Sequence, residues 1–308
     1  MAAREHHPTF SRNFGFYSDE EQKLLAASTV AIAGAGGDGF QLAYKLAMNG
    51  VGTLKIADPE TFAVENANRV FAATKQHLGQ NKAKVFKQMV SQLPLPPKVI
   101  IFEDGVTSKN IDAFLENVDL LIDESELTYL HIGTLLARKA REKGIPQLLV
   151  MNVGFAGVAT SFQPSGGKTF EEVMGIPQGA TLEEIAAIKV DFGRVLPYLP
   201  PYGDETTLRE VQSGAPLPSI SQGVDVASAI GSTEAFLHLT ASAHNHRKQP
   251  VWAPKFRYMD AYTNKGGVIH FPRYSHATKG LKMILRSRMG LNPLAAYAKN
   301  EREKRHSK

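Results

Sequence analysis

Short apolar runs rich in β-branched residues alternate with longer stretches of helical periodicity through the first half of the chain. This alternation is the sequence form of right-handed crossovers between strands of a mostly parallel sheet. The predicted strands are 29–33, 53–57, 98–102, 119–122 and 147–153. The predicted helices are 39–48, 81–92, 108–117 and 129–143. The first half therefore predicts a doubly wound α/β unit, in which ligands bind beyond the carboxyl ends of the strands.

The second half departs from this alternation. Residues 164–223 contain "LPYLPPYGDE" and "SGAPLPS", too much proline and glycine for regular elements, which predicts an insertion or lid over the site. A helix is predicted over 224–246, and "KFRYMDAYTN" with "GGVIHF" then predicts a hairpin that gives the sheet an antiparallel C-terminal edge. The expected divisions are a helical arm 1–28, an α/β core 29–163, the insertion 164–223, a helix and edge hairpin 224–298 completing the same domain, and a charged tail 299–308.

Composition narrows the class of protein. With 308 residues and 43% hydrophobic content, the chain can bury a substantial core. No window approaches the roughly 20 consecutive apolar residues of a membrane span, and the first residues lack a secretory pattern, so we expect a soluble, cytoplasmic protein. The absence of cysteine excludes disulfides, a thiolate zinc site and a cysteine nucleophile. The net charge of +5 is modest and lies partly in the tail, which favours a solvated segment over nucleic-acid binding.

The stretch "VAIAGAGGDG", residues 30–39, is an apolar strand that breaks into four glycines. Gly34, Gly36 and Gly39 fit the pattern G-x-G-x-x-G between a predicted strand and a predicted helix. Such glycines permit a tight turn, a bare approach for phosphate oxygens and close packing of the helix on the strand. Asp58 ends the second strand at about the offset of a ribose-binding carboxylate. Together they predict a Rossmann-like nucleotide site, with a plain turn before a packed helix as the structural alternative.

One residue of the glycine run conflicts with phosphate binding. Asp38 places a carboxylate at the start of the predicted helix, where it would repel an anion unless it points aside or helps to hold a metal.

A second polar group favours ATP over a nicotinamide dinucleotide. Asn66, Asn68 and Arg69 follow the acid pair in "DPETFAVENANRV", and Lys82 lies in "LGQNKAK". A dinucleotide site needs no such cluster, whereas an ATP whose α-phosphate is attacked needs cationic donors around its phosphates. Taken singly, the asparagines also suit a turn, and the cations also suit a solvated surface.

At these residues the chain resembles the ThiF/MoeB-type adenylating enzymes of the ubiquitin-activating (E1-like) superfamily. The likeness runs from residue 10 to about residue 164 and consists of "FSRNF", "GAGGDG" as G-x-G-G-x-G, "GVGTLKIADPE", "NANR", "GQNK" and "DLLIDES". The resemblance implies a homodimer that uses MgATP to adenylate the C-terminal carboxylate of a small protein or peptide. It also implies that Arg12 reaches into the partner subunit's site, so that dimerisation forms part of catalysis.

The resemblance further assigns roles by position. Arg12, Arg69 and Lys82 are the expected catalytic residues, because they would hold the triphosphate and stabilise charge as pyrophosphate leaves. The residues expected to bind the nucleotide are Gly34, Gly36, Gly37, Gly39, Asp58, Glu60, Asn66, Asn68, Arg69, Lys82 and Asp123. The family's magnesium-binding aspartate aligns with Glu126, one methylene longer, and either Glu126 or Glu124 is expected to bind Mg²⁺. Glu60 stands where many members have aspartate.

The missing cysteine removes the thioester and persulfide steps of many relatives, and the zinc that many of them bind. What remains is adenylation, followed by capture of the acyl-adenylate by an external nucleophile. The alternatives are a tRNA-modifying member, a nucleotide-binding scaffold without catalysis and, more distantly, a nicotinamide oxidoreductase. His238, His244 and His246 are interpreted as a helix end rather than a metal site, and residues 271–280 as an edge loop rather than a nucleic-acid contact.

Overall fold

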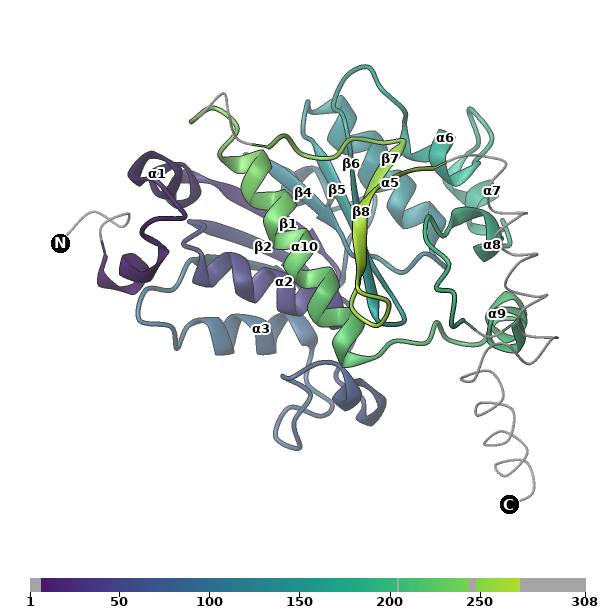
Figure 1. Ribbon diagram of the computed structural model, residues 1–308, viewed down its shortest axis with the longest axis horizontal. Coiled ribbons are helices and arrows are strands. Elements are labelled where there is room, and N and C mark those ends of the chain that lie inside the picture. The colour runs from purple at the N-terminus through teal and green to yellow at the C-terminus, as the bar shows by residue number, and fades with distance from the viewer. Residues whose placement is uncertain (1–6, 204, 244–247, 272–308) are drawn as a thin grey trace.

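The computed structural model describes residues 7–203, 205–243 and 248–271, and the structural statements below concern these residues. They form one eight-stranded sheet in the order β3-β2-β1-β4-β5-β6-β7-β8 (Figure 1). The strands are β1 (Thr29–Ala33), β2 (Thr53–Ala57), β3 (Lys98–Phe102), β4 (Leu120–Asp123), β5 (Gln147–Val153), β6 (Ala156–Phe162), β7 (Lys255–Asp260) and β8 (Lys265–His270). Pairing is parallel from β3 through β5 and antiparallel from β5 to β8. The order reverses between β1 and β4, which is where doubly wound sheets bind ligands.

Helices cover both faces of the sheet (Figure 1). One face carries α2 (Gly37–Met48), α3 (Lys82–Val90) and the long α10 (Ser221–Leu239), whose apolar residues share a core with β1, β2 and β5. The other face carries α4 (Ile111–Phe114) and α5 (Leu130–Glu142), which pack on alanines and leucines of β1 and β4. The remaining helical elements are η2 (Pro8–Asn13), α1 (Asp19–Ala27), η3 (Val64–Asn68), α6 (Phe170–Met174), α7 (Leu182–Ala186), α8 (Phe192–Val195) and α9 (Glu205–Gln212).

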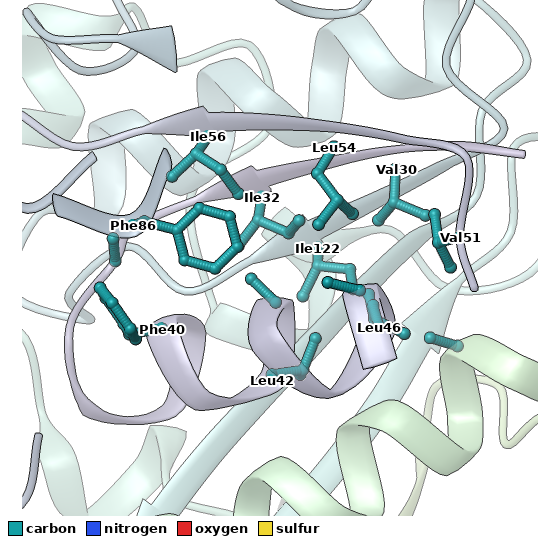
Figure 2. Close-up of a cluster of buried hydrophobic side chains, with 14 of the residues drawn as sticks. Val30, Ile32, Phe40, Leu42, Leu46, Val51, Leu54, Ile56, Phe86 and Ile122 are labelled. Carbon is teal, nitrogen blue, oxygen red and sulfur yellow. The ribbon is translucent and has the colours of Figure 1, made fainter. Parts of the chain in front are cut away.

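The core between α2 and the sheet fixes the position of the glycine run. Figure 2 shows Phe40 and Leu46 of α2 beside side chains from the central strands. Leu42 lies instead against α10, where a Cβ on Gly231 would overlap its Cδ1, and all three side chains are fully buried. The strand residues in this cluster are Val30, Ile32, Leu54, Ile56 and Ile122. A spacing of two residues puts Phe40 and Leu42 about 200° apart around the helix, so α2 is buried on two sides, by the sheet and by α10. Alternate residues of each strand share one side of the sheet. Burying such side chains stabilises the fold by about 1.5–3 kcal/mol each.

The fold class expected from the sequence is confirmed: a mostly parallel, doubly wound sheet with an antiparallel C-terminal edge. The first three strands and the fifth have the predicted bounds, and the fourth begins and ends one residue later. The bounds of α2, α3 and α5 differ from those predicted by one or two residues at an end, and two helices differ more. α4 is a single turn over 111–114, and α10 begins at Ser221 and ends at Leu239, while residues 244–247 lie outside the described residues.

β6 is the strand that the sequence pattern did not reveal. Its sequence, AGVATSF, consists largely of small residues that show no alternation, yet all seven residues are buried between β5 and β7. α10 lies directly on this strand, since a Cβ added at Gly157 would come within 2.6 Å of Ala227 Cα.

Residues 164–223 contain short helices rather than a bare loop. α6, α7 and α8 bury apolar side chains against α5, β5, β6 and β7 in a second hydrophobic cluster. The lid role and the domain divisions remain predictions. Across the described ranges, no helix combines the length and apolar character needed to cross a membrane.

Candidate nucleotide-binding site

The glycine run forms the turn between β1 and α2, at the carboxyl edge of the parallel strands. Gly34 has a φ of +109°, and its N–H donates to Ala57 O of β2 at 2.8 Å. A Cβ at Gly34 would overlap the carbonyl oxygen of Glu124, and a Cβ at Gly39 would overlap the carbonyl oxygen of Gly34. These two positions therefore require glycine for the fold itself, because the backbone of the loop approaches its neighbours too closely for any side chain.

At Gly36, by contrast, the fold itself leaves room for a side chain. Gly36 is the N-cap of α2 with a φ of −77°, makes no side-chain cap, and a Cβ there would meet nothing within 4 Å. The first N–H groups of a helix have no intrahelical acceptor, and the helix dipole favours an anion at this end. Gly36 thus lines open space in front of a helix N-terminus, the arrangement that receives a phosphate.

This difference gives a paired prediction. We expect Gly39→Ala to destabilise the protein by about 1–3 kcal/mol, because the new Cβ has no room. Gly36→Ala should leave the free energy of unfolding within about 1 kcal/mol of wild type but weaken ATP binding by about 10- to 100-fold, because the methyl group occupies the phosphate approach. Differential scanning fluorimetry with and without ATP measures both effects. Equal ATP affinity of Gly36→Ala and wild type would contradict the phosphate assignment.

Asp58 ties the second strand to the glycine loop. It is buried, its Oδ2 accepts from Ala35 N–H at 2.6 Å, and its Oδ1 accepts from Glu60 N–H at 2.8 Å. Burial raises the pKa of this carboxyl, and the nearby Lys82 ammonium opposes that shift. Each carboxylate oxygen offers more than one lone pair, so the group can hold the loop and still accept a ribose hydroxyl.

The cationic side chains lie on the two segments that follow β2. Lys82 at the start of α3 is 6% exposed and forms an ion pair with the half-exposed Glu60. The Cδ of Arg69 lies 3.7 Å from the position of a Cβ on Gly37, and its Nη1 donates at 2.9 Å to Glu65 O and to Asn68 Oδ1. Lys82 and Arg69 therefore both lie beside the open side of the glycine loop.

The two asparagines act on the backbone. Asn66 is buried, and its Oδ1 accepts from Ala63 N–H at 3.0 Å, which closes the turn of η3. Asn68 holds Arg69 and donates through Nδ2 to Ser219 O at 2.9 Å, which ties η3 to the segment before α10. The structure brings both residues to the site as supports of Arg69.

The turn after β4 contains the expected acidic residues in three different environments. Asp123 is buried, and both its oxygens are occupied, Oδ1 by the N–H and hydroxyl of Ser125 and Oδ2 by Gln147 Nε2 at 2.9 Å. Glu126 is exposed and accepts from the Thr128 hydroxyl at 3.1 Å. Glu124 points inward, with Oε1 buried. Mg²⁺ at nucleotide sites takes one or two carboxylates plus phosphate oxygens, and the accessible Glu126 fits that requirement.

Asp38 points aside, as a phosphate site requires. Its Oδ2 accepts from both the backbone N–H of Asn152, at 2.9 Å, and the Asn152 side chain, at 2.8 Å. Burial raises the pKa of Asp38 to about 7 despite these bonds and the nearby Arg69. Burial, together with the charges of Asp38 and Asp123, also raises the pKa of Glu124 well above its usual value. The sequence analysis did not identify Asn152 as a site residue. Its position near the carboxyl end of a predicted strand, at the edge where ligands bind, was the signal that could have found it.

Arg12 lies at the opposite end of α2 from the glycine loop. It belongs to η2, whose Phe10 packs on Gly50 just beyond the helix, where Gln22 also donates to Asn49 O at 2.9 Å. α2 has 12 residues and is therefore about 18 Å long. The structure thus separates Arg12 from the phosphate end of its own chain's site.

A cavity of about 500 Å³ runs along α2 between these two ends. It is lined by Tyr44 and Met48 of the helix and by Arg69 and Phe71 of the neighbouring segment. No residue of the glycine loop lines this cavity, which is therefore a surface adjoining the candidate nucleotide site.

His238 is part of the core. Its Nε2 lies 2.7 Å from Ser161 Oγ, its ring packs on Trp252, and burial lowers its pKa to about 4. His244 and His246 lie outside the described residues, as does nearly all of the segment 271–280 and the tail 299–308.

A doubly wound sheet with a glycine loop, a strand-end aspartate and two bordering cations defines a Rossmann-like nucleotide-binding protein. The ThiF family model matches residues 10–280, and the chain belongs to the ThiF family.

Proteins that are similar in sequence or in structure are consistent with membership of this family. The chain is 29% identical over 155 residues to the tRNA threonylcarbamoyladenosine dehydratase of Bacillus subtilis (strain 168), covering 50% of this chain and 60% of that protein. For the Escherichia coli (strain K12) protein of the same name, identity is 26% over 181 residues, covering 58% and 65%. The chain therefore spans less than two thirds of these curated relatives. E. coli MccB with MccA-N7isoASN has the same fold, with a TM-score of 0.65 and 15% identity, covering 88% of this chain and 74% of that one.

Proposed function

We propose that the protein is an ATP-dependent adenylyltransferase that activates a carboxylate as an acyl-adenylate. The observation that carries this proposal is the placement of Arg69 and Lys82 beside the open phosphate approach at Gly36. Two cations at one glycine loop suit a triphosphate that loses pyrophosphate.

The mechanism relies on positioning and charge. A substrate carboxylate, already ionised, attacks the α-phosphorus in line, the bond to the bridging oxygen breaks, and pyrophosphate leaves with its electrons. No protein base is needed. Asp58 orients the ribose, the N–H groups at Gly36 hold the α-phosphate, and Arg69 and Lys82 stabilise charge on the leaving group. Mg²⁺, held with the help of Glu126, would supply further neutralisation of the phosphates.

We further propose a homodimer in which Arg12 acts in the partner's site. The length of α2 separates Arg12 from its own glycine loop, whereas the cavity along α2 leads from the surface to Arg69. Phe14 and Phe16, next to Arg12, are 88% and 78% exposed, which is unusual for phenylalanine and typical of an interface. A partner's arm laid in the cavity would bury both rings and bring its Arg12 toward Arg69.

The proposed substrate is the C-terminal carboxylate of a peptide or small protein, and with ATP as co-substrate the proposed location is the cytoplasm. Support comes from E. coli MccB, which has been solved with ATP and with N-formylated MccA. Because this chain has no cysteine, the acyl-adenylate would pass directly to an external nucleophile.

Pyrophosphate exchange tests the proposal. With ATP, Mg²⁺, labelled pyrophosphate and a panel of peptide carboxylates, we expect label to enter ATP with at least one substrate. A thermal shift by NADH instead of ATP would indicate an oxidoreductase. ATP binding with no exchange across the panel would indicate a scaffold without catalysis.

A tRNA substrate is the second candidate, favoured by the names of the B. subtilis and E. coli relatives. A gel shift with bulk tRNA over a salt series tests it, because phosphate contacts weaken steeply as salt rises. Absent or salt-insensitive binding would exclude this candidate.

A further inference from the structure

Hydrogen bonds from two sides of the candidate site meet at one residue, Ser219. Ser219 lies just before α10, and its hydroxyl donates to Asn152 Oδ1 at 3.1 Å. Its carbonyl oxygen accepts from Asn68 Nδ2 at 2.9 Å. Ser219 thus joins an asparagine near the carboxyl end of β5 to an asparagine of η3.

The amide of Asn152 is oriented by a neighbour other than Ser219. β4 pairs with β5 as far as Leu149, whereas β5 runs on to Val153. At Asn152, Asp38 Oδ2 stands in for a neighbouring strand and accepts from the backbone N–H at 2.9 Å and from Nδ2 at 2.8 Å. Because the amide nitrogen is turned to Asp38, the amide oxygen is left for the Ser219 hydroxyl. Ser219 therefore meets an acceptor whose position is already fixed.

Asn68 needs a fixed partner because its side chain is exposed. A single hydrogen bond of an exposed amide competes with water and contributes little net free energy. Asn68 Oδ1 accepts from Arg69 Nη1 at 2.9 Å, while Asn68 Nδ2 donates to Ser219 O. Both bonds orient the same planar amide, so an anchored Ser219 carbonyl keeps the Asn68 oxygen turned toward the guanidinium.

The hydroxyl of Ser219 is well placed to anchor the segment that enters α10. Residues 213–218, with the sequence SGAPLP, are all exposed. Ile220, the N-cap of α10, makes no side-chain cap. The first turn of α10 is packed closely on the turn after β5, since a Cβ on Gly223 would overlap Gly154 O. Ser219 thus stands where an exposed segment becomes a packed helix.

Building on the proposed function, we propose that Ser219 is a positioning residue for Arg69. Its hydroxyl anchors the segment before α10 to Asn152, and its carbonyl then holds Asn68 in the orientation that directs the guanidinium. In this role Ser219 contacts neither ATP nor the substrate carboxylate and acts only through Arg69. Asn152 also holds Asp38 aside, so one asparagine of β5 orders both the start of α2 and the arginine.

The kinetics of two Ser219 variants test this role. We expect Ser219→Ala to lower kcat for pyrophosphate exchange by about three- to tenfold, the value of one hydrogen bond, with the KM for ATP within about twofold of wild type. Ser219→Thr keeps the hydroxyl and should recover most of the rate. In an Arg69→Ala background, Ser219→Ala should cause no further loss, because residues that act through one group are not additive. The exposed Ser213→Ala, in the same segment, is the matched control and should behave like wild type.

Hydrogen exchange of the ATP-free protein tests the same contact without chemistry. The N–H groups of Arg69 and Val70 donate to Asn66 O at 3.1 and 2.9 Å, so their exchange reports on the order of η3. By mass spectrometry, we expect the peptide that covers residues 64–70 to exchange at least about threefold faster in Ser219→Ala than in wild type or Ser219→Thr.

Two results would overturn the inference. One is unchanged hydrogen exchange of residues 64–70 in Ser219→Ala. The other is a loss of kcat on Ser219→Ala that has the same size with and without Arg69, which would mean a general structural effect. If residues 64–70 loosen in Ser219→Ala but wild type supports no pyrophosphate exchange with any carboxylate, the adenylation proposal fails and the positioning of Arg69 by Ser219 stands.

Discussion

The Arg69→Ala variant is expected to lose pyrophosphate exchange by about 10²–10³-fold, the loss seen when one donor to a developing charge is removed. The Cδ of Arg69 borders Gly37, and its guanidinium donates to Glu65 O and Asn68 Oδ1, so its position is set before any ligand arrives. Because it acts on charge that grows as pyrophosphate leaves, the loss should fall on kcat more than on the KM for ATP. Steady-state exchange at varied ATP measures both parameters.

Two further variants separate this role from a general loss of positive charge. Arg69→Lys keeps the charge but cannot bond both Glu65 O and Asn68 Oδ1 in the same geometry, and we expect it to recover only part of the rate. Lys87→Ala removes an exposed cation from α3 and should behave like wild type. Exchange by Arg69→Ala at the wild-type rate would refute the assigned role of this arginine.

The parallel half of the sheet was predictable because its strands are buried on both faces. Such strands appear as continuous apolar runs, and the residue that ends each run, such as Asp58, falls at the ligand edge. β6 could not be found in the same way. Ala156, Gly157 and Ala159 are small because α10 packs closely on them, and small residues carry no strand signal.

The sequence predicted which residues gather at the candidate site, but it did not predict which groups each of them contacts. Asp123 was expected at the nucleotide, yet Ser125 and Gln147 satisfy both its oxygens, and the residue shapes the turn that presents Glu126. Whether Asp123 also contacts a ligand remains a prediction. Asp38 and Glu124 interact although they are 86 positions apart, because the start of α2 packs against the residue that follows β4, and no local pattern could reveal this contact.

Mixing two inactive variants, Arg12→Ala and Arg69→Ala, is expected to restore activity to about one quarter of wild type. In a mixed dimer, the subunit that carries Arg12→Ala supplies Arg69 to its own site and receives Arg12 from the other subunit. That site is complete, while the second site lacks both arginines. Random exchange of subunits makes half of the dimers mixed, with one of two sites active in each. Pyrophosphate exchange measured after the two proteins are denatured and refolded together gives the recovered fraction.

The expected recovery follows from where the fold puts the arm. With Phe10 anchored at Gly50 and the glycine loop at the other end of α2, no rotamer of Arg12 spans the helix length to its own site. If Arg12 instead acted within its own subunit, every site in the mixture would lack one arginine and no activity would return. A Phe14→Ala/Phe16→Ala variant provides the matching structural control. It should sediment as a monomer and stay inactive when mixed with Arg69→Ala, because the exposed rings are the proposed anchors of the exchanged arm.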